Sequence, residues 1–172
     1  NRLSPAGISM LYTAEDELTA RRETVGRSKQ HFTIARIRAE RDLRIVDLVD
    51  LPERKGIFRP DSFREERATL NFAHEFTAQL TKPVRRSSRK RSMELIEYVP
   101  SQVVTEYIRY RLQPDGVPVD GLRYPSAKRK GGVNIVLFFG HEDLFGSDTV
   151  EAQEPAPISL VNVERVPSSG KI

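Results

Sequence analysis

The chain has 172 residues, of which 38% are hydrophobic and 30% are charged, a composition typical of a folded domain with one modest core. The net charge of +4 favours an anionic partner, and the absence of cysteine excludes disulfides and thiolate metal sites. The three histidines, at 31, 74 and 141, show no paired-ligand spacing, and no apolar run is long enough for a membrane span; we expect no metal and a cytoplasmic location.

The N-terminal segment carries a strand and a helix in quick succession. The first residue is Asn rather than Met, so we expect a fragment truncated at its N-terminus. Residues 8–12 form an apolar run that predicts a strand, and Thr13 is expected to cap a helix over about residues 14–24. Glu23 falls near the C-terminal end of this helix, where a negative charge gains nothing from the helix dipole. Stability therefore does not explain Glu23.

The next segments predict two strands and an amphipathic helix. Residues 31–39 and 43–50 alternate between apolar and polar side chains, which predicts two strands that form a hairpin. Residues 63–80 place apolar side chains at intervals of three, four and seven, the period of a helix with one buried face. Residues 84–92 contain five basic residues without stacking aromatics, which predicts a solvated loop and leaves contact with a phosphate or an acidic partner as the alternative.

The second half of the chain contains the most apolar strand. Residues 93–99 predict a short strand, and residues 100–112 predict a helix with its proline at the first position. Residues 133–139 predict a buried strand at the centre of a sheet. Residues 140–157 are polar and loop-like, and residues 158–166 alternate as a last edge strand.

The order of these elements predicts the fold class. Strands and helices do not alternate strictly, so we expect an α+β fold rather than a doubly wound parallel sheet. The sequence contains neither a dinucleotide-binding G-x-G-x-x-G motif nor a phosphate-binding G-x-x-x-x-G-K loop. A bound nucleotide would therefore be held by other means.

Three stretches of the chain resemble the RES domain family, which is named for its Arg, Glu and Ser. They are NRLSPAGISMLYTAEDELTARRE at the start, EYVPSQVVTEYIR in the middle and DGLRYPSAKRKGGVNIVLF toward the end. They occur in the order of the family and cover most of residues 1–140. The resemblance implies a single RES-like domain over residues 1–172, with an ADP-ribosyltransferase-like fold of two small sheets around a cleft and about three helices.

The resemblance also implies a site and an activity. The family positions correspond here to Arg2, Tyr12 and Glu23 as catalytic residues and to Ser126 and Asn134 as substrate-binding residues. Members of the family resemble ADP-ribosyltransferase toxins in fold and are known as toxins of toxin–antitoxin pairs that consume NAD. We therefore expect an enzyme that cleaves the nicotinamide–ribose bond of NAD by hydrolysis or by phosphorolysis, with inorganic phosphate as co-substrate in the second case, and an antitoxin or inhibitory protein as partner.

The chemistry of NAD cleavage suits these residue types. Cleavage develops positive charge on the ribose, which the carboxylate of Glu23 would stabilise. Arg2 offers a planar fork of donors for the pyrophosphate or an incoming phosphate, and the ring of Tyr12 would stack on nicotinamide. Ser126 would donate a hydrogen bond to the carboxamide or a phosphate oxygen, and Asn134 would support its loop.

Two alternatives stay open at this point. The same site would serve an ADP-ribosyltransferase that modifies a protein. The basic run at residues 84–92 would instead suit a module that binds an acidic partner or, less readily, nucleic acid.

Overall fold

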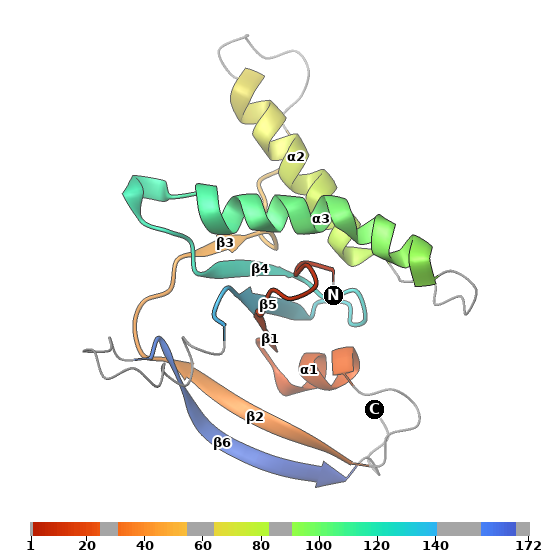
Figure 1. The fold of residues 1–172 in the computed structure, drawn as a ribbon, viewed down its shortest axis with the longest axis vertical. Helices are drawn as coiled ribbons and strands as arrows, with labels where there is room; N and C mark the ends of the chain where they lie inside the picture. Colours follow the sequence, from red (N-terminus) through yellow and green to blue (C-terminus); the bar gives the residue numbers. More distant parts are fainter. Residues whose placement is uncertain (1, 25–30, 55–63, 83–90, 141–155, 168–172) are drawn as a thin grey trace.

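The computed structural model describes residues 2–24, 31–54, 64–82, 91–140 and 156–167. Within these ranges the chain forms three α-helices and six strands in two sheets, which confirms the α+β class (Figure 1). The expected cleft between the sheets stays a prediction. The strands are β1 (Leu11–Ala14), β2 (His31–Ala39), β3 (Ile45–Asp47), β4 (Gly121–Pro125), β5 (Val133–Leu137) and β6 (Ile158–Pro167). The helices are α1 (Glu17–Thr24), α2 (Arg64–Thr81) and α3 (Arg91–Arg111), followed by a short 3-10 turn η2 (Pro114–Gly116).

The larger sheet has the strand order β1-β5-β4-β3. Strand β5 lies inside the sheet and pairs antiparallel with β1 and β4, whereas β3 pairs parallel with β4. Leu122 of β4 and Val136 of β5 are completely buried. The prediction of a buried central strand at residues 133–139 is therefore confirmed, with β5 ending at Leu137.

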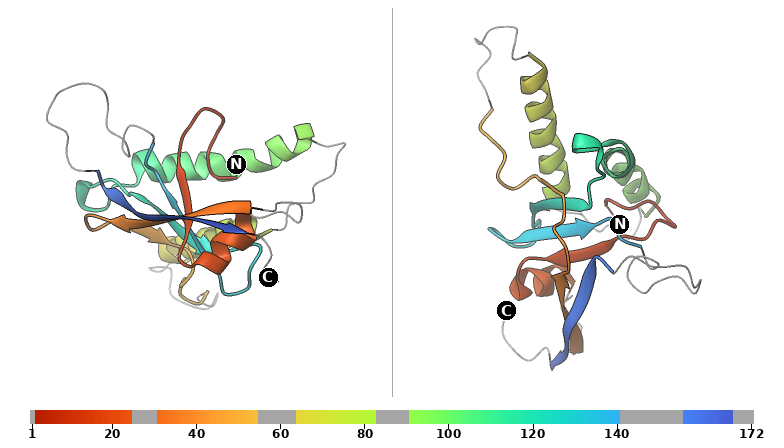
Figure 2. Two further views of the ribbon diagram at one scale, coloured as in Figure 1. Left: turned by 90° about the horizontal axis from the view of Figure 1, so that it is seen from below. Right: turned by 90° about the vertical axis from the view of Figure 1, so that its left-hand side faces the viewer.

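The molecule is layered, with α2 and α3 on one side of the larger sheet and α1 and the smaller sheet on the other (Figures 1 and 2). The main core lies between the larger sheet and the helices α2 and α3, and its buried side chains are Leu3, Leu48, Phe76, Leu80, Ile108, Val119, Leu122, Val136 and Phe138. A second cluster contains Leu137, Phe139 and Ile158, the last of which belongs to β6. Because neighbouring strand residues point to opposite faces, Val136 and Leu137 join different clusters.

The expected hairpin of residues 31–39 and 43–50 is wrong, because the two strands lie in different sheets. Strand β2 pairs antiparallel with β6 along nine residues, and β3 joins β4. Asp120 explains the separation: its carboxylate accepts hydrogen bonds from the Arg41 side chain at 2.6 Å and from the Arg44 N–H at 2.8 Å. These bonds hold the chain that follows β2 against the start of β4.

The expected strand at residues 93–99 is also wrong, because these residues are the first part of helix α3. Pro100 lies inside this helix rather than at its first position. A proline removes one intrahelical hydrogen bond, and a short apolar run does not by itself distinguish a strand from a buried helix. The hydroxyl of Ser101 lies 2.6 Å from the Arg2 carbonyl and 2.9 Å from the Tyr98 carbonyl, and the shorter contact ties this part of α3 to the N-terminal segment.

The other predicted elements have mixed outcomes. The helix predicted at residues 63–80 is confirmed as α2, and the last strand is confirmed as β6. The first strand begins later than expected, since β1 covers Leu11–Ala14. Most of the basic run (residues 84–90) and most of the polar segment (residues 141–155) lie outside the described residues. Among the described helices, none has the length and apolar composition needed to cross a membrane.

Candidate functional site

Helix α1, which carries Glu23, begins at an aspartate cap. The backbone N–H of Thr19 donates to Asp16 Oδ1 at 3.0 Å, and the Thr19 hydroxyl donates to Asp16 Oδ2 at 2.7 Å. These hydrogen bonds lower the pKa of Asp16 below its ordinary value. The expected cap at Thr13 is wrong, because Thr13 belongs to β1 and its hydroxyl donates to the Ile135 carbonyl.

The start of α1 is held against the turn that follows β4. Arg129 Nη1 donates to Asp16 Oδ2 and to Thr19 Oγ1, both at 2.8 Å. Thr19 is completely buried, and a Cβ atom added at Gly132 would lie 2.6 Å from its hydroxyl oxygen. Only a glycine allows this close approach between α1 and the turn.

The carboxylate of Glu23 lies at the other end of α1 and contacts three residues far along the chain. Its Oε1 atom accepts hydrogen bonds from Ser126 Oγ at 2.6 Å and from Asn134 Nδ2 at 3.0 Å. The ammonium of Lys128 lies 3.7 Å from Oε2 and also donates to the backbone carbonyl of Glu23. The Glu23 side chain is 27% exposed, so it is partly sheltered while still reachable from solvent.

These contacts fix the charge of Glu23. Burial by itself raises the pKa of the carboxyl group. The hydrogen bonds from Ser126 and Asn134 and the charge of Lys128 lower this pKa, and together they outweigh the effect of burial. The net effect is a pKa below the ordinary value. Glu23 is therefore a carboxylate at neutral pH, suited to stabilise a cation and not to donate a proton.

Ser126 is the centre of a small network in the turn after β4. Its hydroxyl oxygen accepts hydrogen bonds from the N–H groups of Lys128 and Arg129, both at 3.1 Å. A hydroxyl has a single hydrogen, which here is directed to Glu23. In this structure Ser126 therefore orients the carboxylate; its expected bond to substrate stays a prediction.

Tyr12 lies on the face of the larger sheet that also carries Asn134. It pairs with Val136, two residues along β5 from Asn134, and side chains two apart on a strand share a face. Its hydroxyl donates to Ser4 Oγ at 3.1 Å, and burial raises the pKa of the phenol. Tyr12 as a whole residue is still 39% exposed, so part of it is accessible.

Tyr124 is a site residue that the sequence reasoning missed. It pairs directly with Asn134 in the sheet and packs partly against the main core. Burial, the neighbouring Tyr12 phenol and the negative charge of Glu23 raise its pKa, and Arg2 acts in the opposite direction. Tyr124 thus lies within electrostatic reach of three predicted site residues. Its position two residues before Ser126, on the same face, is the signal that would have identified it.

Arg2 has a different set of contacts from the other predicted residues. Its guanidinium donates to the carbonyls of Gln79 at 3.1 Å and of Leu80 and Lys82, at the C-terminal end of α2, and its carbon lies 5.8 Å from the centre of the Tyr98 ring. These contacts satisfy carbonyls that have no partner within the helix. The structure therefore brings Glu23, Ser126 and Asn134 into direct contact and holds Arg2 at α2; Arg2's catalytic role stays a prediction.

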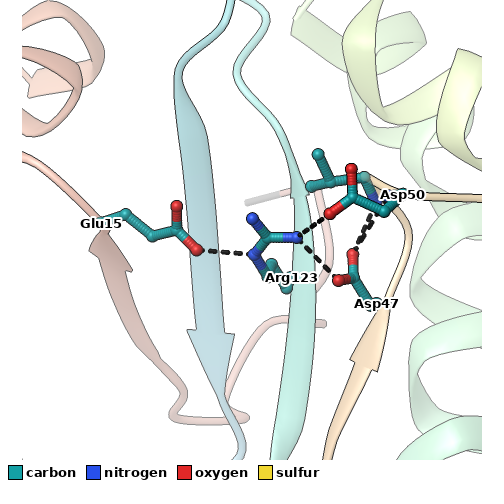
Figure 3. A network of polar contacts seen from close by, with 5 residues as sticks. Glu15, Asp47, Asp50 and Arg123 are labelled. Atoms are coloured by element: carbon teal, nitrogen blue, oxygen red, sulfur yellow. Dashed lines mark hydrogen bonds and ion pairs between the residues drawn. The ribbon is translucent and has the colours of Figure 1, made fainter.

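A second polar network surrounds Arg123, next to Tyr124 in β4 (Figure 3). The guanidinium donates to Glu15 at 2.6 Å, to Asp47 at 2.7 Å and to Asp50 at 3.0 Å. The three carboxylates raise the pKa of Arg123 above its ordinary value, with the Glu15 hydrogen bond as the largest cause. Because Glu15 directly precedes the Asp16 cap, this network connects the start of α1 to β3 and β4.

Comparison with known proteins gives one match. The sequence model of the RES domain matches residues 1–159. No match was found among curated proteins or among solved structures. The matched range contains Glu23, Ser126, Asn134 and the turn that carries Lys128.

Proposed function

Because the chain belongs to the RES domain family, we propose that it is an enzyme that cleaves the nicotinamide–ribose bond of NAD. The observation that carries this proposal is the Glu23 carboxylate, held ionised by Ser126, Asn134 and Lys128. The family match supports an enzyme that acts on NAD in general. The bond cleaved and the acceptor are part of the proposal.

Glu23 supplies the electrostatic contribution that this reaction needs. When the bond between ribose C1′ and the nicotinamide nitrogen breaks, the electron pair leaves with nicotinamide and positive charge develops on the ribose ring. Nicotinamide departs as a neutral molecule, so the site needs no acid to protonate it. A carboxylate already fixed by two hydrogen bonds stabilises the developing cation without reorganising.

The two oxygens of Glu23 have separate tasks in this scheme. Oε1 is held by Ser126 and Asn134, whereas the closest described cation to Oε2, Lys128 Nζ, lies beyond hydrogen-bond distance at 3.7 Å. Oε2 is thus available to accept a hydrogen bond from a ribose hydroxyl. Tyr12 is partly exposed and close enough to Tyr124 to influence its pKa, and its ring offers aromatic surface for the flat nicotinamide.

The acceptor determines the product. With water, an oxygen bonds to C1′, a proton is released, and the products are nicotinamide and ADP-ribose. With inorganic phosphate, the product is ADP-ribose 1-phosphate. We propose one of these two reactions, with the resulting loss of NAD as the basis of a toxin activity that an antitoxin protein restrains.

The test is incubation of the folded protein with NAD, with and without phosphate, followed by chromatography of the products. Release of nicotinamide together with ADP-ribose or its 1-phosphate supports the proposal. Transfer of ADP-ribose to added proteins without free ADP-ribose would identify a transferase that uses the same site. An unchanged NAD pool would overturn the proposal.

A further inference from the structure

Three arginines of the site region have guanidinium groups committed to protein acceptors. Arg2 donates to carbonyls at the end of α2, and Arg129 donates to Asp16 and Thr19. Arg123 is held by three carboxylates. A dinucleotide with an ionised pyrophosphate needs a cation close to the reacting ribose, and these arginines already have anionic or carbonyl partners.

Lys128 is a cation placed directly beside Glu23. Its ammonium lies 3.7 Å from Glu23 Oε2 and donates to the Glu23 carbonyl, while the side chain is 48% exposed. An ammonium has three donors, so this one retains capacity for a ligand. The 5′-phosphate of NAD is attached to the ribose whose C1′ reacts, and in phosphorolysis the attacking phosphate approaches the same C1′. A cation next to the catalytic carboxylate is within reach of both groups.

We propose that Lys128 binds a phosphate group beside the reacting ribose, an inference that rests on the proposed function. The phosphate belongs either to the pyrophosphate of the dinucleotide or to inorganic phosphate as co-substrate. In the free protein the Lys128 ammonium faces the Glu23 carboxylate. When substrate binds, each of these two groups gains a ligand group of opposite charge to interact with. Glu23 then meets the developing cation and Lys128 meets the anion.

A purely structural role for Lys128 makes different predictions. The Glu23 carbonyl lies in the last turn of α1, where a lysine is favourable because it satisfies a free carbonyl and the negative end of the helix dipole. Loss of that contact would lower stability and would affect every substrate equally. A phosphate-binding role instead discriminates between substrates with and without phosphate.

The experiment compares Lys128→Met with Lys130→Met, which removes an exposed lysine of the same turn. The KM is measured for NAD and for nicotinamide riboside, which has the same scissile bond and no phosphate, and phosphate is titrated separately. We expect Lys128→Met to raise the KM for NAD about tenfold or more, with nicotinamide riboside unaffected. Lys128→Arg should restore most of the NAD affinity, and Lys130→Met should match the wild type.

The two phosphate sources give distinct results. A raised KM for NAD identifies the pyrophosphate, whereas a raised half-saturating phosphate concentration at unchanged NAD KM identifies the inorganic phosphate. Equal rises in the KM for NAD and for nicotinamide riboside at an unchanged half-saturating phosphate concentration, or no change in any of these three values, would overturn the inference.

Calorimetric titration with ADP-ribose makes the test independent of turnover. We expect Lys128→Met to weaken ADP-ribose binding about tenfold and Lys130→Met to leave it unchanged. This result would support the phosphate site even if the wild type consumes no NAD. That result would separate failure of the proposed function from failure of this inference. If the wild type and Lys128→Met bind ADP-ribose equally well, that result would contradict the proposed phosphate-binding role of Lys128. It would not count against the proposed NAD cleavage.

Discussion

The hydroxyl oxygen of Ser126 lies 2.6 Å from Glu23 Oε1, although 103 residues separate the two in the chain. The contact has a fixed direction, because two backbone N–H groups of the same turn donate to the hydroxyl oxygen and leave its hydrogen for the carboxylate. Ser126 therefore both positions Glu23 and favours its ionised form.

Ser126→Ala should lower kcat/KM for NAD roughly tenfold to hundredfold, because a hydrogen bond to a charged group contributes about 1.5 to 3 kcal/mol. Steady-state kinetics gives the value, and thermal unfolding serves as the control for folding. An unchanged kcat/KM in the folded variant would show that Glu23 does not depend on Ser126.

The pH dependence of the reaction should follow Glu23. Its pKa in the folded protein lies below the ordinary value of 4.5, so the carboxylate and the activity persist through neutral and mildly acidic pH. Activity should fall only as the pH drops below that value. In Asn134→Ala, which loses one stabilising donor, the acidic limb should move to higher pH. A wild-type limb centred above pH 6 would contradict this assignment.

Gly132→Ala should destabilise the protein by about 1 to 3 kcal/mol, because the new methyl group would lie 2.6 Å from the Thr19 hydroxyl. Urea denaturation gives the free energy of unfolding. NAD consumption should fall as well, since α1 carries Glu23 and must move away from the turn.

A double-mutant cycle with Thr19→Ala provides the control. Removing the Thr19 side chain also removes the clash, so the double variant should be more stable than the sum of the two single changes predicts. Simple additivity would mean that Gly132 is required for a reason other than contact with Thr19.

Arg123→Met should lower the free energy of unfolding by about 1 to 3 kcal/mol at neutral pH, because it leaves three carboxylates close together without their cation. Asp47 has a lowered pKa in the folded protein, and such a group contributes stability above its unfolded pKa that is lost as the pH falls through the folded pKa. The difference between wild type and variant should therefore shrink below about pH 4. Denaturation at several pH values tests this, and a constant difference would argue against an electrostatic role.

Local patterns predicted the elements whose partners are close in sequence or whose period is clear. The amphipathic period of residues 63–80 gave α2 within one residue at each end, and the apolar run at residues 133–139 gave the central strand β5. The pairing of β2 was not predicted, because its partner β6 is more than a hundred residues away. Alternating apolar and polar residues predict a strand but not the strand with which it pairs.

The candidate site was predicted as a set of residues and not as a network. The resemblance gave Glu23, Ser126 and Asn134, which the fold brings together. It did not assign Tyr124 or Lys128 to the site, because their proximity to Glu23 depends on sheet register and on the shape of the turn after β4. Helix α1 begins later than predicted, with its cap at Asp16 rather than at Thr13. The reason is that pairing in the larger sheet extends β1 through Ala14.

The most direct test of the account is NAD consumption by Glu23→Gln. Glutamine keeps the size of the side chain and loses the charge, so it isolates the electrostatic contribution to cleavage. We predict that the folded variant turns over NAD at least about a hundredfold more slowly than the wild type, which corresponds to roughly 3 kcal/mol, while NAD binding changes little. A Glu23→Gln protein that consumes NAD at the wild-type rate would show that Glu23 is not the catalytic carboxylate.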